Sequence, residues 1–155
     1  MRLRPVNIKR KPGLDEKNRL GIRFELLGVT PTVWRTLVVR EAITLSTLWK
    51  AISIAFDITE PSTVRFERGS SILEEHVAVE AAFGAVGNRA LCSITLANGE
   101  SFFLGIEVLV SEPQDSDEPR LAFCSGGEGG LISADVECNL NEVNERLRGG
   151  GAPLM

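Results

Sequence analysis

The segment RLGIRFELLGVTPTVWRTLVVREAITLSTLWKAISIAFD, residues 19–57, decides the expected fold, because a strand, a turn, a second strand and a helix follow one another in it. Its first part alternates apolar residues with Gly, Arg and Glu, which is the period of a strand that buries one face. The apolar positions are Leu20, Ile22, Phe24 and Leu26. Gly28 and Thr30-Pro31 interrupt this pattern and predict a turn. The β-branched run 33–39, with Arg35 interposed, is expected to pair back onto the first strand.

The second half of this segment predicts the strongest helix of the chain. Thr44 is suited to cap it, because a threonine side chain can accept a hydrogen bond from a free amide of the first turn. An apolar stripe with helical spacing follows, formed by Leu45, Leu48, Trp49, Ile52 and Phe56. We therefore expect the helix at 44–56 to pack on the preceding hairpin, each large buried side chain contributing about 1.5–3 kcal/mol before its entropy cost.

Beyond residue 57 the patterns predict a second group of strands. Residues 63–67 alternate like a short strand, and the polar stretch 68–75 is predicted to be a surface loop. A weak alternation over 76–80 suggests a small strand, and residues 81–87 a short helical or turn segment anchored by Phe83. Residues 90–110 predict a hairpin, since Asn98-Gly99 is typical of a type I′ turn with positive φ at both central residues.

The last third of the chain predicts one more strand and one more helix. The acidic, proline-bracketed stretch EPQDSDEPR at 112–120 indicates an exposed loop. A strand is expected at 121–124, ended by GGEGG at 126–130, which is predicted to be a flexible glycine loop. Asn139, three residues before Glu142, is typical of a helix N-terminus. The apolar stripe of that helix is Leu140, Val143 and Leu147.

Together these elements predict an α+β fold with a single domain over residues 19–148 and a flexible tail over 149–155. A mainly antiparallel sheet of five or six strands is expected to pack against the 44–56 helix and to be closed by the C-terminal helix. The length of 155 residues suits one domain that buries roughly two-thirds of its unfolded surface.

The composition also bears on location. No apolar run approaches the ~20 residues needed to cross a bilayer, and the basic N-terminus has no apolar segment behind it, so neither a membrane span nor a secretory signal is expected. Cys92, Cys124 and Cys138 are too few and too irregularly spaced for a disulfide framework and are expected to be reduced. These features predict a cytoplasmic protein.

Charge divides the chain into a basic arm and an acidic body. The first nineteen residues carry seven basic and two acidic residues, a net charge of +5, whereas the remainder carries ten basic and nineteen acidic residues, a net charge of −9. Residues 1–18 show no sustained period and are predicted to form a mobile arm. Its candidate contacts for nucleic-acid phosphates are Arg2, Arg4, Lys9, Arg10 and Lys11. A solvated terminus accounts for the same composition, and it is favoured because no aromatic residue interleaves the basic ones.

Several of the residues above also match a known family. Phe24-Glu25-Leu26 leads into Thr30-Pro31 and, after two further residues, Trp34-Arg35, and then come Ile43-Thr44-Leu45, Leu48, Ile52 and Ala55. In this order the chain resembles the Ri-plasmid ORF-three-like family, whose members also occur as passengers of insertion elements. The resemblance is specific mainly over residues 20–57, and a weaker similarity extends over 91–110 and Pro119-Arg120. It implies an α+β fold and a mobile-element context, and no catalytic residue is carried over from it.

The chain departs from that family at three places. The family's Asp-Phe-Gly-Asp-Gly-Trp hairpin is replaced by LANGE at 96–100, where only the glycine turn is kept. Trp49 stands where the family's helix often has His. The family's later Cys- and Pro-rich acidic segment is replaced by CSGGEGG at 124–130. A site that used those positions in the family would be lost or changed in this protein.

Reactive chemistry has little support among the available side chains. A metal site would have to combine His76 with Cys92, Cys124 and Cys138, which include no closely spaced pair. His76 is the one histidine and could serve a nucleophile, but its position beside two glutamates favours a solvent-facing role. GGEGG lacks the Lys and Ser or Thr of a phosphate-binding loop.

Two further groups of residues admit a binding role. Asp115, Asp117 and Glu118 lack the spacing and glycine of an EF-hand loop, so they are interpreted as solvated charges. Trp34 and Trp49 could stack on a base or ligand, but both lie on apolar faces of predicted elements and are expected to anchor the core. We predict no metal and no cofactor.

The composition therefore favours a non-enzymatic binding or accessory protein of plasmid or mobile-element origin. Its acidic surface is expected to contact a macromolecular partner, and a protein with a basic surface is the partner that suits it. The alternative is a nucleic-acid-binding protein that uses the basic arm. A third class, a small hydrolase, would depend on His76.

Overall fold

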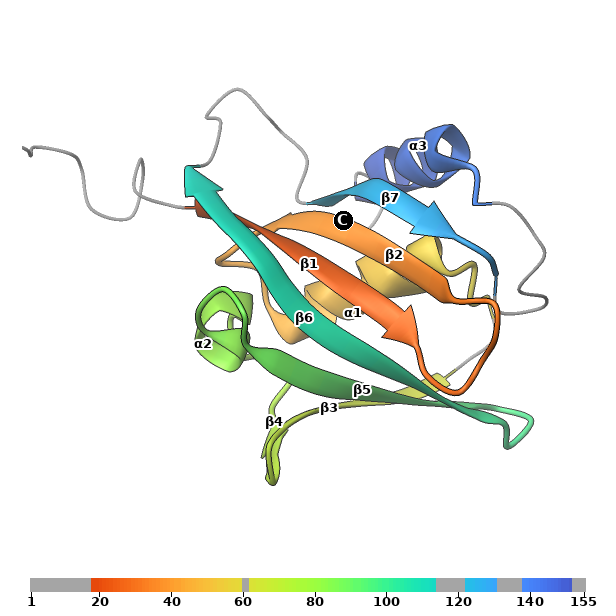
Figure 1. Ribbon diagram of the computed structural model, residues 1–155, viewed down its shortest axis with the longest axis horizontal. Coiled ribbons are helices and arrows are strands. Elements are labelled where there is room, and N and C mark those ends of the chain that lie inside the picture. The colour runs from red at the N-terminus through yellow and green to blue at the C-terminus, as the bar shows by residue number, and fades with distance from the viewer. Residues whose placement is uncertain (1–17, 60–61, 114–121, 131–137, 152–155) are drawn as a thin grey trace, which may run out of the picture.

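A seven-stranded antiparallel sheet, in the order β4-β3-β5-β6-β1-β2-β7, forms the centre of the molecule (Figure 1). The computed structural model describes residues 18–59, 62–113, 122–130 and 138–151. The strands are β1 (Asn18–Leu26), β2 (Val33–Arg40), β3 (Ser62–Arg68), β4 (Ser71–Leu73), β5 (Arg89–Leu96), β6 (Ser101–Pro113) and β7 (Ala122–Glu128). The helices are α1 (Leu45–Ala55), α2 (Val79–Phe83) and α3 (Leu140–Gly151). The predicted α+β fold with a mainly antiparallel sheet is confirmed, with seven strands in place of five or six.

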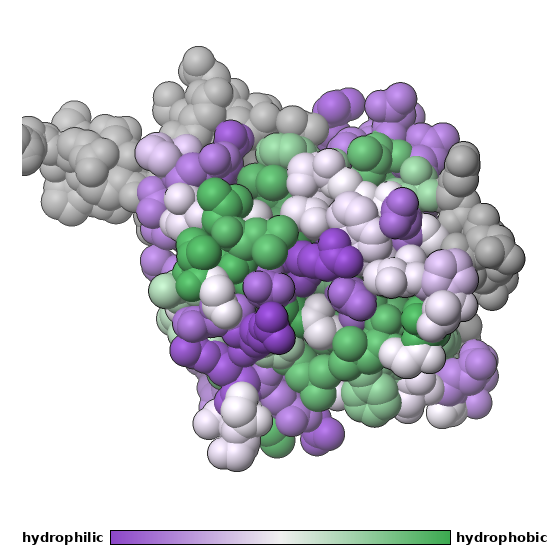
Figure 2. Space-filling view, in the orientation of Figure 1, coloured by the Kyte–Doolittle hydropathy of each residue, from purple (hydrophilic) through white to green (hydrophobic). Residues whose placement is uncertain are grey.

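The helices leave one face of the sheet open. Helix α1 lies behind the sheet in Figure 1, with α3 beside β7 and α2 at the start of β5. No described helix crosses the near face of β6, β1 and β2. Apolar and hydrophilic areas interleave on that face in Figure 2, so it does not form one continuous apolar surface. None of the described helices is long and apolar enough to span a membrane.

The first hairpin and α1 form as their sequence pattern predicts. Strands β1 and β2 pair without a break from Leu26↔Val33 to Arg19↔Arg40. The Thr44 hydroxyl caps α1 by accepting a hydrogen bond from the Thr47 amide at 3.2 Å. The buried residues of α1 are Leu45, Leu48, Ala51, Ile52 and Ala55. Their burial against the apolar positions of the sheet supplies the main stabilisation of this layer.

Arg35 of β2 is a buried cation that joins three elements, and its exposed fraction is 5%. Its Nε donates to the Ala55 carbonyl at the end of α1 at 2.8 Å. Its Nη1 donates to the Glu128 carbonyl at 3.0 Å and to the Trp34 carbonyl at 2.8 Å, and Nη2 donates to the Gly129 carbonyl at 2.7 Å. The guanidinium also lies 4.9 Å from the centre of the Phe56 ring. Carbonyl dipoles, including the negative end of the α1 dipole, offset the charge in this site.

Two short-range predictions in the middle of the chain were wrong. The stretch 68–75 contains β4, which pairs with β3 around a turn at Gly69 and Ser70. The stretch 76–80 holds no strand but a turn, one isolated bridge between Ala78 and Thr44, and the start of α2. A three-residue strand is too short to show a period of two, so the pattern could not reveal β4.

The β5–β6 hairpin forms where predicted but with a different turn. Gly99 has a φ of 95°, whereas Asn98 is not among the residues with positive φ. The Gly99 amide donates to the Leu96 carbonyl at 2.9 Å, and the Leu96 amide donates to the Glu100 carbonyl at 2.8 Å. This is a three-residue loop with a type I turn and a glycine bulge, so the type I′ turn expected from the Asn-Gly pair was wrong.

The glycine-rich segment after Cys124 belongs partly to the sheet. Gly126 and Gly127 lie in β7, opposite Thr36 and Arg35 of β2, so the predicted flexible loop was wrong over this part. A Cβ on Gly127 would stand 2.7 Å from Arg35 Cδ and 3.0 Å from the Trp34 carbonyl oxygen. Glycine is therefore required here by close packing, and only residues after Glu128 leave the strand.

The first and last elements of the structure extend slightly beyond the predicted limits of the domain. Asn18, assigned to the arm, is the first residue of β1 and pairs with Pro113. Helix α3 is capped by Asn139, whose Oδ1 accepts from the Glu142 amide at 3.0 Å. It continues to Gly151, so the tail predicted from residue 149 begins too early. Residues 1–17 and 152–155 lie outside the described part of the chain.

We predict that Arg35→Met lowers the free energy of unfolding by about 2–5 kcal/mol, because several buried carbonyls lose their donor at once. Urea unfolding measures the change. Arg65→Met is the matched control, since the Arg65 side chain is 56% exposed and its loss should change stability by less than about 1 kcal/mol. Equal and small effects of both substitutions would contradict the structural role of Arg35.

We also predict that Gly127→Ala lowers the free energy of unfolding by about 1–3 kcal/mol through overpacking against Arg35 and the β2 backbone. The exposed Ser125 of the same strand supplies the control, and Ser125→Ala should lie within about 0.5 kcal/mol of the parent. If Gly127→Ala also leaves the free energy of unfolding nearly unchanged, the segment behaves as the flexible loop that the sequence suggested.

Candidate binding site at the free edge of the sheet

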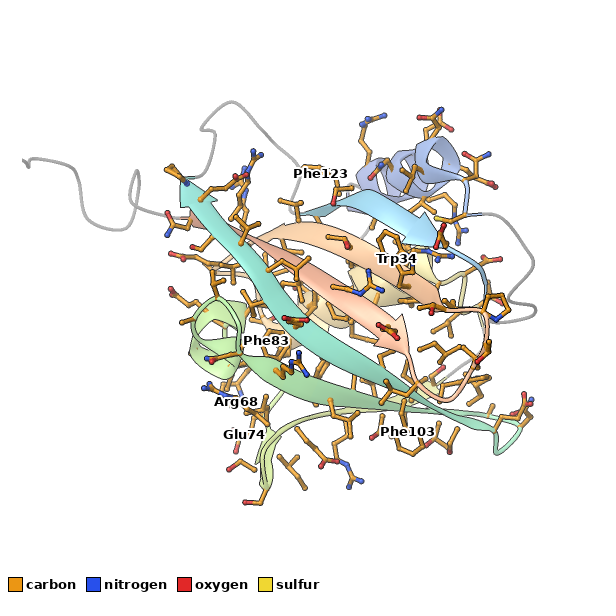
Figure 3. All side chains as sticks on the ribbon, in the orientation of Figure 1. Trp34, Arg68, Glu74, Phe83, Phe103 and Phe123 are labelled. Carbon is orange, nitrogen blue, oxygen red and sulfur yellow. The ribbon has the colours of Figure 1, made fainter. Side chains whose placement is uncertain are left out.

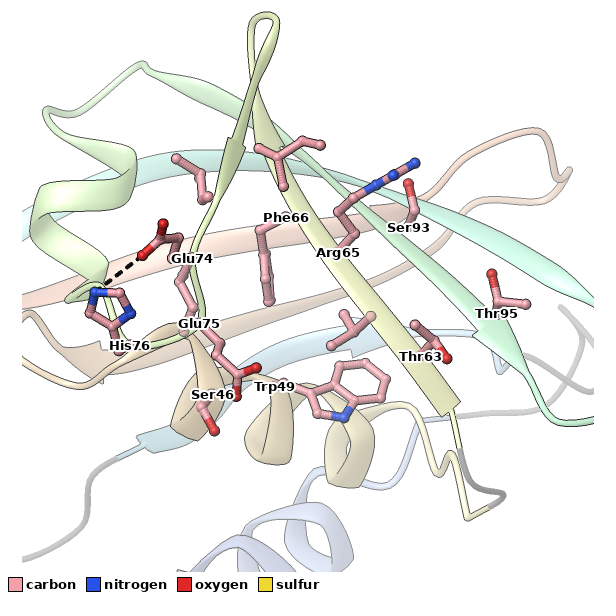
Figure 4. A pocket seen from close by; sticks show the side chains of 14 residues that line it. Ser46, Trp49, Thr63, Arg65, Phe66, Glu74, Glu75, His76, Ser93 and Thr95 are labelled. Atoms are coloured by element: carbon pink, nitrogen blue, oxygen red, sulfur yellow. Dashed lines mark ion pairs between the residues drawn. The ribbon is translucent and has the colours of Figure 1, made fainter.

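A cavity of about 650 Å³ opens at the outer edge of β3 (Figure 4). Its lining comes from α1 (Leu45, Ser46, Trp49), β3 (Thr63, Val64, Arg65, Phe66), β4 and the following turn (Ile72, Leu73, Glu74, Glu75, His76) and β5 (Ser93, Thr95). Strand β4 pairs only with the last three residues of β3, and the cavity lies beside the earlier part of that strand. Its volume falls within the roughly 300–1,000 Å³ of typical ligand pockets.

The wall next to α1 is apolar. Leu45 and Phe66 are buried, with 0% and 3% of their surface exposed. Trp49 and Val64 are partly buried and pack against the core. Ile72 is 62% exposed at the β4 side. An apolar group that entered the cavity would therefore exchange water for side-chain contacts on this wall.

The turn after β4 gives the cavity an acidic rim. Glu74 and His76 form an ion-pair contact of 3.3 Å between Oε1 and Nε2, with about three-quarters of each side chain exposed. The backbone of this turn is held against the first turn of α1, since the Glu75 carbonyl accepts from the Ser46 amide at 2.9 Å. In Figure 4 Glu75 points toward Ser46 and Trp49 of α1, whereas Glu74 and His76 face each other on the other side of the turn. This exposed position of His76 confirms the solvent-facing role expected for it.

The two tryptophans do not form a common platform. Arg35 points toward the helices, so the strand alternation sends Trp34 to the opposite face of β2 (Figure 3). There the Trp34 Nε1 donates to Glu128 Oε1 at 3.0 Å, and the Arg23 guanidinium lies 4.5 Å from the ring centre. The prediction that Trp34 anchors the core was wrong. Trp49 does pack against the core, and it is also part of the cavity wall.

The cysteines and His76 are not brought together. Cys92 lies in β5 and Cys124 in β7, four strand spacings apart in the sheet order, or roughly 19 Å at ~4.8 Å a spacing. Burial raises the pKa of Cys92 to about 12 and, as the largest cause, that of Cys124 to about 11. Both thiols are therefore protonated near neutral pH and unsuited to nucleophilic attack. Among the described residues no group of three metal-ligating side chains occurs.

Other predicted site residues fall outside the described part of the chain. These are the arm residues Arg2, Arg4, Lys9, Arg10 and Lys11 and the acidic residues Asp115, Asp117 and Glu118. Conversely, sequence reasoning missed Ile72 and Glu75 as site residues because it treated 68–75 as a loop. A three-residue strand gives no periodic signal, so the sequence pattern offered none for the hairpin that places them.

Comparisons with known proteins inform the fold alone. No family model and no curated protein matches the chain. The chain is similar to a crystal structure of MM3350, a protein of unknown function from Methanosarcina mazei Go1, with a TM-score of 0.63 and 18% sequence identity. The similarity covers 85% of this chain and 80% of that one. It shows that this arrangement of sheet and helices occurs in a solved structure.

The buried thiols predict a pH dependence of stability. An unfolded cysteine ionises near pH ~8.5, whereas the pKa of Cys92 is raised to about 12. Its contribution is fully present below the unfolded pKa and is lost as the pH rises toward the folded pKa. We expect Cys92→Ala to flatten the fall in unfolding free energy over this window. Cys138→Ala, at a partly exposed position, is the control, and identical slopes for all three proteins would contradict the assignment.

Proposed function

We propose that this protein is a non-enzymatic binding protein that holds a protein partner at the cavity beside β3. The observation that carries the proposal is the combination of an apolar wall and an acidic rim at an open strand edge. Apolar contact supplies affinity at such a site, and peripheral charge supplies orientation and on-rate. The net charge of −9 outside the first nineteen residues favours a partner with a basic surface.

The rim places carboxylates where a partner would meet them. Glu74 is about three-quarters exposed and Glu75 is also exposed, so a lysine or arginine of the partner can reach either, at Glu74 in exchange for the exposed contact with His76. Such exposed pairs are worth little individually, but together they raise the association rate and make it depend on salt. Binding by the cavity should therefore weaken as ionic strength rises.

The setting of this function is part of the proposal. The resemblance to the Ri-plasmid ORF-three-like family supports an accessory role on a plasmid or other mobile element, in the cytoplasm. The basic arm supports a second candidate, a nucleic-acid-binding role, because five basic residues lie within its first eleven positions. The two candidates predict different responses to nuclease and to deletion of the arm.

The test is capture of partners on the immobilised full chain from an extract of the source organism, with and without nuclease. We predict a protein partner that survives nuclease, is released by high salt and is lost when Glu74→Lys and Glu75→Lys are combined. The matched control combines Glu142→Lys and Glu145→Lys on α3, which changes the net charge equally at exposed positions away from the cavity.

Two results would overturn the proposal. One is a partner whose binding is indifferent to ionic strength and to the rim substitutions. The other is binding that disappears on nuclease treatment and on deletion of residues 1–17, which would favour the nucleic-acid role of the arm.

A further inference from the structure

The geometry of the β3–β4 hairpin determines which backbone groups face the free edge. Arg68 and Ser71 flank the two-residue turn and form the closing pair, and pairing ends at Phe66↔Leu73. Hydrogen-bonded pairs alternate along an antiparallel ladder, so Arg68 and Phe66 bond toward β4. Val64, the next residue of this series, presents its N–H and C=O in the same direction. No strand of the described chain pairs with Val64 on that side.

The opposite edge of the sheet, strand β7, is covered by a helix side chain. Asn144 of α3 lies against β7, where its Oδ1 accepts from the Cys124 amide at 2.6 Å and its Nδ2 donates to the Cys124 carbonyl at 2.8 Å. The side-chain amide thus occupies the backbone groups that a neighbouring strand would use. Proteins commonly block edge strands in this way to prevent unwanted pairing. The open backbone at Val64 therefore stands out against a protected edge in the same sheet.

The cavity lies beside this open backbone. An added strand would run about 4.8 Å from β3, and its alternate side chains would point to the two faces of the sheet. Those on the helix side would meet the wall made by Trp49, Val64 and Phe66. Glu74 and Glu75 flank the same space at the end of β4. The site thus offers main-chain hydrogen bonds, an apolar pocket and negative charge to one extended segment.

We propose that the partner binds as an extended peptide segment that adds a strand to the outer edge of β3, with apolar side chains against Trp49 and lysine or arginine side chains at Glu74 and Glu75. This inference rests on the proposed function and names the chemistry of its partner. The recognition mode is β-strand addition, in which main-chain bonds give affinity and pockets for alternate side chains give specificity.

The probe is a displayed library of random ten-residue peptides selected on the full chain at low salt. We expect enrichment of peptides that carry apolar residues at alternate positions, for the helix side, and Lys or Arg at the end that lies next to Glu74 and Glu75. The strongest peptide is then synthesised in two N-methylated forms, one blocked at odd and one at even positions. The form that is methylated at the N–H groups facing β3 should bind about tenfold or more weakly than the unmodified peptide, and the other form should not. Each lost backbone hydrogen bond contributes a fraction of that loss.

A variant of the protein supplies the reciprocal measurement. Val64→Pro removes the outward N–H, and proline is tolerated at an edge where the N–H faces away from the ladder. Val64→Pro should weaken binding of the unmodified peptide by a similar factor. Glu142→Lys combined with Glu145→Lys should leave the affinity for the peptide within about twofold of the parent. Where Val64→Pro lowers the amount of folded protein, the two N-methylated peptides still decide the question on the parent chain.

Several outcomes would overturn strand addition. They are selection of no alternating peptide, equal binding of the two N-methylated forms, or a dimer of this chain that pairs β3 edges in solution. If the captured partner still requires Glu74 and Glu75 but is indifferent to Val64→Pro, strand addition fails while the proposed function stands. If the partner ignores the glutamates as well, both fail.

Discussion

The buried guanidinium of Arg35 is the interaction on which the arrangement of the molecule depends. It holds the end of α1 through the Ala55 carbonyl and the end of β7 through the carbonyls of Glu128 and Gly129. A buried cation is stable only when its donors are satisfied, so these three elements must meet at one place. With its end held at β2, α1 lies across the back of the sheet and places Trp49, near its middle, beside β3. Helix α1 thereby supplies one wall of the cavity.

Local periodicity predicted most of the architecture. Strands β1 and β2, the helix α1 with its Thr44 cap, and the β5–β6 hairpin carry strong patterns within a few residues, and each formed close to its expected position. The patterns failed where a tertiary contact decided the outcome. Gly126 and Gly127 look like loop residues until Arg35 and Trp34 are seen to press against them. The side chain of Trp34 would fit the core, but only one of two adjacent strand residues can face it. Arg35 takes that position in β2, so Trp34 lies on the opposite face.

The site was less predictable than the fold because it is assembled from segments with weak patterns. Strand β4 has three residues, and the acidic turn after it looks like any solvated loop. The site depends on what is missing beside β3, and a sequence cannot show that one strand ends before its neighbour. Trp49 was correctly expected to pack against the core, yet its exposed part faces the cavity. The contrast between an edge closed by Asn144 and an edge left open at Val64 appears only once the strands are ordered.

Hydrogen exchange of the Val64 amide tests the central claim most directly. In the free protein this amide should exchange far faster than those of Thr63 and Arg65, whose N–H groups point to β5, because hydrogen-bonded amides are protected. Binding of the partner should slow exchange of the Val64 amide and leave the exchange rates of the Thr63 and Arg65 amides nearly unchanged. Slow exchange at Val64 in the free protein, or no added protection in the complex, would contradict an open edge that binds an extended chain.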